Sequence, residues 1–395
     1  MKLKRFFITL LSAAALTVGS NAANPVKSCD KLPMSMYIWQ GCLADSDFVD
    51  RINFGNFDMV YLMDKSLWNN QAEFDCDIDN ILADRHNIIP LTKRDLFKLA
   101  VDNAHAANTL ALLSVGNDLL FSSLDDERMN KSADALCQTV EQLDLDGLDI
   151  DWEIDVWRHF DRHALLMATL RSKLDSLSTV TGKKYKLSTA LSAAAKYPDQ
   201  WRGTLAAAVD HVNLMSYDLG GCLWRDYASH NTPLAIIDRY INDCWYDIPR
   251  EKLHLGLASY GFMYNGILPD ERVPEGKTIG DYGRFVDYKN MLPYMYGQTA
   301  WRRQYDPVDH MNYFIDDNGH SFITMETPET IADKFDYAVD AGLGGTFWWE
   351  YAKDIIPDNN GSRYWHHILV PDHKYVGTHP GASKPKNRKN SNNNE

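Results

Sequence analysis

The sequence predicts an α/β fold, a (β/α)8 TIM barrel with a small α+β insertion between strands seven and eight. Short runs rich in apolar and β-branched residues recur eight times along the chain, and segments with helical periodicity separate them. A length of 395 residues suits one large barrel. The expected strands cover residues 34–40, 57–63, 110–116, 145–153, 185–192, 211–218, 253–259 and 345–350.

The connecting segments support this order. Residues 92–107, 130–143 and 159–178 carry apolar residues at steps of three and four, which predicts helices. Thr327 and Pro328 give the last helix a capping residue and an early proline. Residues 261–325, between the seventh and eighth expected strands, contain strand-like runs of their own, so we expect them to form the insertion.

The two ends of the chain differ in composition from the middle. Lys2, Lys4 and Arg5 precede an apolar run at 6–18 and small residues at 20–22, a pattern typical of a secretory signal peptide over residues 1–22. We therefore expect a secreted or periplasmic protein without a membrane span. The barrel is expected to occupy residues 23–381, and residues 382–395, rich in Lys and Asn, to form a disordered polar tail.

Composition narrows the choice of partners. The net charge of -14 argues against nucleic acid as a partner. Eleven Trp, 20 Tyr and 15 Phe are more aromatic surface than a core needs, and such rings stack on the faces of sugars.

The six cysteines fit no zinc pattern; Cys222 and Cys244 are the favoured disulfide pair, and Cys137 is expected to be a buried free thiol. We expect a monomer.

The expected fourth strand alternates acidic and apolar residues with the period of a β-strand. It would direct Asp149, Asp151 and Glu153 to one face and apolar residues to the other. Carboxylates about 6 to 7 Å apart on a shielded face cannot all ionise cheaply, so protons are shared and at least one pKa is raised. A protonated carboxyl beside ionised ones is what general acid catalysis at an acetal oxygen requires.

Further polar and aromatic residues reach the carboxyl ends of the expected strands, where active sites of such barrels lie. Several strands contributing ionisable and aromatic groups at one end favour a functional site over a solvated edge strand. These residues are Ser114, Asn117, Met215, Tyr217, Asp218, Tyr260, Trp348 and Trp349.

Residues 146–153, DGLDIDWE, resemble the signature of glycoside hydrolase family 18, the chitinase family, whose pattern reads D-G-x-D-x-D-W-E. The resemblance extends in order to Ser114-Val115-Gly116 on strand three, Met215-Ser216-Tyr217-Asp218 on strand six and residues 345–349 on strand eight. It includes the insertion and spans nearly the whole mature chain.

The resemblance implies a role for each acid. Glu153 would protonate the leaving glycosidic oxygen and later activate water, while the substrate's own N-acetyl oxygen acts as the nucleophile. Asp151 would stabilise the resulting oxazolinium ion, and Asp149 would share a proton with Asp151. Tyr217 would hydrogen-bond the acetamido oxygen. The expected substrate-binding residues are Met215, Asp218, Trp349 (the floor under the reacting sugar), Tyr260 and Asn117, with Trp348 packing away from them.

Two positions depart from the family pattern, and both concern outer sugar contacts. Asn117 stands where many members have glycine, and Phe262 stands where arginine is common. The preferred substrate is therefore open.

The leading hypothesis is a chitinase that cleaves β-1,4 bonds between N-acetylglucosamine units of an oligo- or polysaccharide, with retention and no metal or organic cofactor. One alternative is an endo-β-N-acetylglucosaminidase that cuts the chitobiose core of N-glycans; Trp152 and the insertion favour the chitinase. A catalytically silent lectin is a further alternative, but such proteins usually lose the acid at Glu153. His159 and His163 have metal-ligand spacing, although a solvated helix face is the expected explanation.

Overall fold

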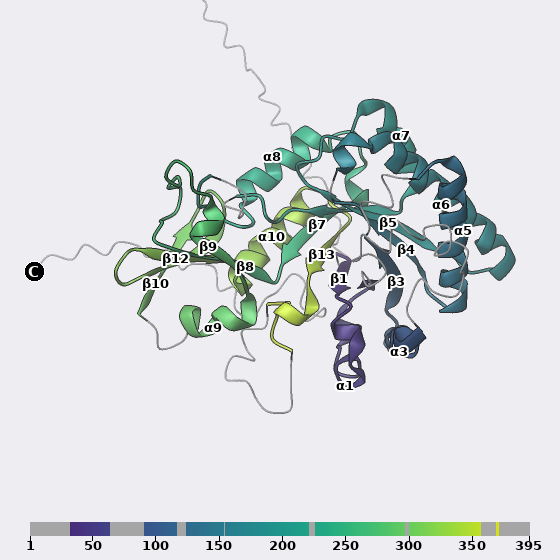
Figure 1. The fold of residues 1–395 in the computed structure, drawn as a ribbon, viewed down its shortest axis with the longest axis horizontal. Helices are drawn as coiled ribbons and strands as arrows, with labels where there is room; N and C mark the ends of the chain where they lie inside the picture. The colour runs from purple at the N-terminus through teal and green to yellow at the C-terminus, as the bar shows by residue number, and fades with distance from the viewer. Residues whose placement is uncertain are drawn as a thin grey trace, which may run out of the picture. The chain divides into compact units, whose positions relative to one another are not determined.

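The computed structural model describes residues 32–63, 91–116, 124–153, 155–220, 226–296, 300–356 and 369–370. Eight parallel strands close into a barrel, in the order β1-β13-β7-β6-β5-β4-β3-β2. Figure 1 labels several of these strands and shows helices outside them. The predicted fold class is confirmed. The barrel strands are β1 (Met34–Ile38), β2 (Met59–Met63), β3 (Leu110–Val115), β4 (Gly147–Asp151), β5 (Lys186–Ser192), β6 (His211–Met215), β7 (Leu253–Ala258) and β13 (Gly345–Trp349).

Helices connect these strands, and local sequence explains where several of them begin or end. The Asp125 side chain caps one helix by accepting from the N–H of Arg128 at 2.8 Å, and Thr327 forms a capping box before the last helix, as predicted. The α-helices are α1 (Ser46–Val49), α3 (Leu91–Ala106), α5 (Asp126–Gln142), α6 (Phe160–Thr181), α7 (Asp199–Ala208), α8 (Leu234–Cys244) and α10 (Pro328–Asp340). Short 3-10 helices are η1 (Cys42–Ala44), η2 (Phe54–Asn56), η3 (Val156–Arg158), η4 (Arg250–Lys252), η5 (Ile279–Asp281) and η6 (Tyr351–Lys353).

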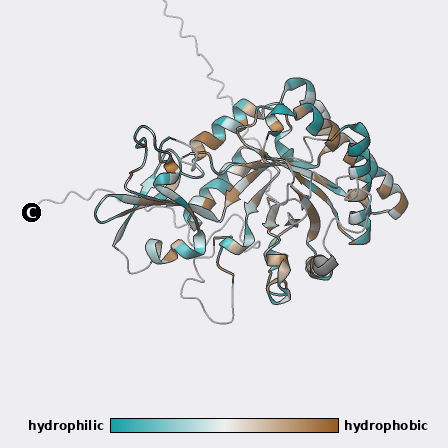
Figure 2. Ribbon diagram, in the orientation of Figure 1, coloured by the Kyte–Doolittle hydropathy of each residue, from teal (hydrophilic) through white to brown (hydrophobic). Residues whose placement is uncertain are grey.

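Strand β4 separates two environments. Leu148, Ile150 and Trp152 are fully buried in the large core between the strands and the helices. Asp149 and Asp151 belong to the opposite face, inside the barrel. In Figure 2 apolar residues concentrate on the barrel strands, while the outer helices mix apolar and polar residues. The alternation of the sequence therefore becomes an apolar outer face and an acidic inner face.

A second sheet follows β7 in the chain and lies beside the barrel in Figure 1. It is antiparallel, with the order β10-β11-β12-β8-β9. Its small core includes Phe262, Tyr264 and Phe322. The expected limits of the insertion, 261–325, remain a prediction. The elements of this region are β8 (Tyr260–Asn265), β9 (Gly283–Asp287), α9 (Tyr288–Tyr296), β10 (Trp301–Asp306), β11 (Met311–Asp316) and β12 (Ser321–Met325).

Two expectations about local structure were wrong. Strand β4 pairs with β5 only as far as Asp151, so Glu153 lies two residues beyond the strand instead of at its last position. His163 is not on a solvated helix face: it is completely buried, and its ring nitrogens contact the hydroxyls of Tyr197 and Thr189, each at 3.0 Å. Burial lowers the pKa of His163 to about 3, so this imidazole is a neutral core group.

Several expectations concern residues outside the described part of the chain, namely the signal peptide at 1–22, Asn117, Cys222 and the tail at 382–395. Cys137 is a buried free thiol, as expected. Cys244 is also a free thiol in the described part of the chain, and its expected pairing with Cys222 stays a prediction because Cys222 lies outside the described residues. None of the helices in the described ranges has the length and apolar character needed to cross a membrane.

Candidate active site

A pocket of about 110 Å³ opens at the carboxyl ends of the barrel strands. Its walls come from β1, β4, β5, β6 and β13 and from the segments that follow β4, β6 and β7. This is the end of the barrel at which active sites are found. The lining residues are Tyr37, Asp151, Glu153, Ala190, Met215, Tyr217, Asp218, Tyr260 and Trp349.

All the predicted site residues in the described ranges except Asp149 line this pocket. Asp149 lies deeper in the barrel and is completely buried. Its neighbours in the sheet register are Ser114 on β3 and Ser188 on β5. Asp149 Oδ2 accepts hydrogen bonds from Ser114 Oγ and Tyr37 Oη, each at 2.8 Å, and Oδ1 accepts one from Ser188 Oγ at 2.6 Å.

Burial raises the pKa of Asp149, and the three hydroxyl donors oppose that rise. The expected direction, a raised pKa for a carboxyl of the acidic strand, agrees with Asp149, but the cause is burial and not the charge of the neighbouring acids. The protonated form of Asp149 is therefore accessible at a higher pH than for an exposed aspartate. An adjacent group that holds a proton reversibly is suited to exchange it with Asp151, the next acid on this face of β4.

Exposure differs along the acidic face. Asp149 is 0% exposed and Asp151 is 5% exposed, whereas Glu153, on the loop after β4, is exposed. The outermost carboxyl can therefore reach a ligand at the rim, and the inner two are shielded from water. Burial, followed by the negative charges of Glu153 and Asp151, raises the pKa of Tyr217 well above its ordinary value. Tyr217 keeps its proton and is available as a hydrogen-bond donor.

Asp218 and Tyr260 face each other in the pocket wall. The Tyr260 hydroxyl donates to Asp218 Oδ1 at 2.8 Å, and the Tyr260 ring stands edge-on to Tyr217, with centroids 6.1 Å apart. Burial raises the pKa of Asp218 to about 6; the Tyr260 hydrogen bond opposes this shift, and the charge of Glu153 adds to it.

The raised pKa of Asp218 predicts a pH-dependent stability. The folded protein binds this proton more tightly than the unfolded chain does. Ionisation of Asp218 therefore lowers the free energy of unfolding as pH rises from about 4 to about 6, and the decrease is complete above that range. Urea unfolding should show that Asp218→Asn gains stability relative to the wild type between pH 4 and pH 6 and keeps that advantage at pH 7. A stability difference that is constant from pH 4 to pH 7 would contradict the assignment.

The two tryptophans of β13 point to opposite faces, as predicted. Trp348 is fully buried in the core outside the barrel. Trp349 lines the pocket and contacts aromatic rings edge-on, with centroid distances of 5.8 Å to Tyr37 and 6.0 Å to Trp39. Trp349 therefore offers an indole on the acidic side of the barrel.

Sequence reasoning missed Tyr37, Ser188 and Ala190. Tyr37 and Ser188 each interrupt an apolar strand with a hydroxyl, which is a weak signal of an inward-facing polar group. The register of β4 with β5 places Ser188 beside Asp149, and the closure of the barrel brings the Tyr37 hydroxyl of β1 to the same carboxylate.

Other features of the described residues fit a catalytic site less well. A shallower groove of about 560 Å³ between α6 and α7 is lined mainly by small residues and hydroxyls, with a single acid, Asp175. His230, Asp306 and Asp309 have donor atoms within 4.8 Å of one another, which is metal-ligand geometry. His230 and Asp306 also have structural roles, however. His230 Nδ1 contacts Thr324 Oγ1 at 2.9 Å, Asp306 Oδ1 accepts two N–H groups of the β10–β11 turn, and His230 Nε2 lies 3.5 Å from Asp306 Oδ2.

The fold and the pocket define a class of protein: a (β/α)8 barrel with a row of carboxyls and an aromatic wall at the carboxyl ends of its strands. The chain belongs to the glycosyl hydrolases family 18, whose family model matches residues 38–354. The resemblance seen in the sequence is confirmed.

Curated relatives cover part of the chain. Chitinase A1 of Niallia circulans is 27% identical over an alignment of 257 residues, and the match covers 56% of this chain and 36% of the relative. Endochitinase 1 of Metarhizium anisopliae is 29% identical over 227 residues, 53% of this chain and 52% of the relative. The chain thus spans about half or less of the length of these relatives.

Solved structures share the fold. The chitinase ChiW of Paenibacillus sp. str. FPU-7 has a TM-score of 0.69 at 22% identity, covering 89% of this chain and 43% of that one. The GH18 chitinase of Cycas revoluta in complex with (GlcNAc)3 has a TM-score of 0.65 at 17% identity, covering 82% of this chain and 96% of that one.

Proposed function

We propose that this protein is a chitinase, a glycosidase that hydrolyses β-1,4 bonds between N-acetylglucosamine units. The observation that carries the proposal is the graded row of acids along and just after β4: Asp149 and Asp151 are shielded inside the barrel, and Glu153 is exposed at the pocket. Membership of the family and relatives described as chitinases and endochitinases support it.

In the proposed mechanism the substrate supplies its own nucleophile. Glu153 donates a proton to the glycosidic oxygen, and the N-acetyl oxygen of the sugar on the other side of the bond closes on the anomeric carbon of that same sugar as the bond breaks. The developing oxazolinium ion is positive, and the shielded carboxylate of Asp151 stabilises it in a site of low dielectric. Glu153 then takes a proton from the water that opens the ring, so the β configuration is retained.

The other pocket residues orient the reacting sugar. The protonated hydroxyl of Tyr217 donates to the acetamido oxygen and favours the geometry in which that oxygen attacks. The Trp349 indole supports the apolar face of the ring. Met215, Asp218 and Tyr260 complete the pocket around the acetamido group, and Asp149 exchanges its proton with Asp151. Asn117, the remaining predicted contact, lies outside the described residues.

Product analysis by mass spectrometry tests the substrate. The purified protein is incubated separately with chitotetraose and with a high-mannose glycoprotein. We expect chitobiose or N-acetylglucosamine from the first and no released glycan from the second. Release of glycans with one sugar left on Asn would assign the protein as an endo-β-N-acetylglucosaminidase instead of a chitinase. Binding of chitotetraose without any cleavage would assign it as a lectin.

We also propose that the protein is exported, with cleavage near Ala23. The support is the basic start, the apolar run at 6–18 and the small residues at 20–22. N-terminal sequencing of the exported protein should begin close to Ala23; retention of Met1 in the exported protein would contradict a cleaved signal.

A further inference from the structure

A buried asparagine outside the pocket connects two of its walls. Asn231 lies on the segment before α8 and is 1% exposed. Its Oδ1 accepts the backbone N–H of Asp218 at 2.7 Å, and its Nδ2 donates to the backbone carbonyl of Tyr260 at 3.1 Å. One carboxamide thus bridges the segment after β6 to the start of β8.

The polarity of both partners fixes the orientation of this carboxamide. A backbone N–H can only donate and a carbonyl can only accept, so Oδ1 must face Asp218 and Nδ2 must face Tyr260. An aspartate would have the right length, but its ionised form has no donor for the Tyr260 carbonyl. An apolar residue would leave both backbone groups unpaired in a buried position. The site is therefore specific for asparagine.

The backbone of Asp218 needs such support. Its φ is +58°, in the left-handed region that L-residues adopt at a cost. The N–H of Leu219 also donates to the Asn231 carbonyl, at 3.1 Å. A Cβ on Gly220 would lie 2.7 Å from the His230 carbonyl oxygen, so the two segments touch backbone to backbone. These backbone contacts keep the two segments adjacent, and the Asn231 carboxamide is the side chain that bonds the N–H of Asp218 itself.

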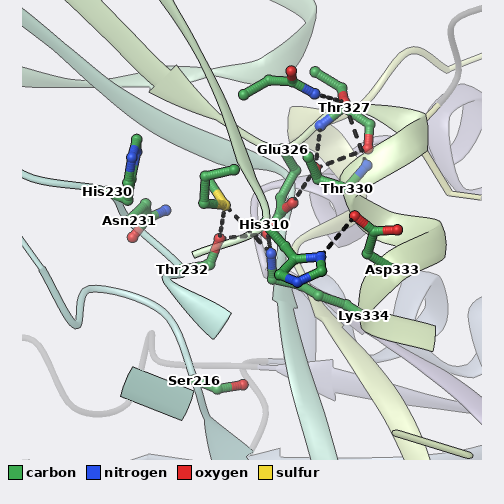
Figure 3. A network of polar contacts seen from close by, with 12 residues as sticks. Ser216, His230, Asn231, Thr232, His310, Glu326, Thr327, Thr330, Asp333 and Lys334 are labelled. Atoms are coloured by element: carbon green, nitrogen blue, oxygen red, sulfur yellow. Dashed lines mark hydrogen bonds and ion pairs between the residues drawn. The ribbon is translucent and has the colours of Figure 1, made fainter. Parts of the chain in front are cut away.

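The segment that carries Asn231 is anchored on its other side by a buried ion pair (Figure 3). Lys334 Nζ lies 2.8 Å from Glu326 Oε1, with the two side chains 0% and 1% exposed. Thr232 Oγ1 donates to the same carboxylate. The hydrogen-bond partners of the Thr232 hydroxyl, Glu326 and Met311, do not line the pocket. Thr232 therefore anchors the segment, and the adjacent Asn231 supports the pocket wall.

We propose that Asn231 is a positioning residue of the active pocket: its carboxamide sets Asp218 and Tyr260 at the spacing that lets the Tyr260 hydroxyl bond Asp218. The inference rests on the proposed glycosidase function. A neutral amide placed in this way pre-organises the wall that faces the acetamido group, so its loss acts on the turnover rate.

The first test compares Asn231→Ala with Thr232→Val on chitotetraose. Asn231→Ala removes the hydrogen bonds to the backbone of Asp218 and of Tyr260. Because a misplacement of about 1 Å in an active site can lower the rate by about 10²-fold, we expect this variant to lower kcat by about 10- to 100-fold. Thr232→Val should lower the melting temperature through Glu326 and leave kcat within about 3-fold of wild type. Equal losses of kcat in both variants would reduce Asn231 to a structural role and overturn the inference.

The pH dependence of Asn231→Asp gives a readout that stability alone does not move. When protonated, the introduced carboxyl can donate to the Tyr260 carbonyl; when ionised, it opposes that carbonyl. The ratio of variant to wild-type kcat should therefore fall as pH rises, and a flat ratio from pH 4.5 to 7.5 would overturn the inference.

A crystal structure of Asn231→Ala separates this inference from the proposed function. We expect Asp218 to leave the left-handed region and its contact with the Tyr260 hydroxyl to break. Unchanged positions of both residues would overturn the inference whatever the activity, whereas a wild-type protein that cleaves no N-acetylglucosamine polymer would overturn the proposed function alone.

Discussion

Glu153→Gln should lower kcat on chitotetraose by about 10³- to 10⁴-fold, at the upper end of what general acid catalysis contributes. Glutamine keeps the shape of the side chain and removes the proton that the leaving oxygen needs. Glu153 is exposed at the pocket rim, where a glutamine of the same shape is also solvated, so folding should be unaffected. Steady-state kinetics and the affinity for chitotetraose, measured by calorimetry, check both expectations.

A matched control lies on the same loop. Asp155 is a half-exposed acid two residues beyond Glu153 and is not among the residues that line the pocket. Asp155→Asn removes one negative charge near the pocket, as Glu153→Gln does, and should leave kcat within about 3-fold of wild type. Similar losses in the two variants would mean that local charge, and not a proton donor at Glu153, drives the reaction.

Asp151→Asn should lower kcat by about 10²- to 10³-fold, the effect expected when a shielded group that stabilises developing charge is lost. Asp151 is 5% exposed and lines the pocket between Asp149 and Glu153. An amide of the same size cannot supply the negative charge that favours an oxazolinium ion. Single-turnover measurements should assign the loss to the chemical step.

The control for Asp151→Asn is the acid at the other end of the same strand. Asp146 precedes β4 and contacts His105 at 2.9 Å, Lys183 at 2.9 Å and the Ala111 N–H at 2.8 Å. Asp146→Asn should therefore lower thermal stability and leave kcat near the wild-type value. If Asp151→Asn retained kcat within 10-fold of wild type, Asp151 would not stabilise the charge of the intermediate.

The barrel was predictable because its strands are short, apolar and separated by helices with clear periodicity. Each of the eight expected strands overlaps an observed one. The ends were less accurate: apolar Trp152 continues the alternation of β4 in the sequence, but the hydrogen-bonded pairing with β5 ends at Asp151. Alternation reports which face a side chain takes, and pairing with a neighbour decides where a strand stops.

The site residues whose side chains line the pocket could be predicted from the sequence. A residue that acts through hydrogen bonds to the backbone could not. Acids and aromatics at strand ends are visible in a sequence, and so Asp151, Glu153, Tyr217 and Trp349 were found. Asn231 was not, because its partners are the main chains of Asp218 and Tyr260, 13 and 29 residues away. The prediction of a solvated helix face was wrong for His163. Helical periodicity does not reveal that the hydroxyls of Tyr197 and Thr189 contact both nitrogens of this buried ring.

The most direct measurement of the central claim is the anomeric configuration of the first products, followed by proton NMR during chitotetraose hydrolysis. Attack by the N-acetyl oxygen followed by water predicts that the new reducing ends appear as the β anomer and reach the equilibrium mixture only by slow mutarotation. New ends that appear first as the α anomer would contradict the account, because they would require direct displacement by water.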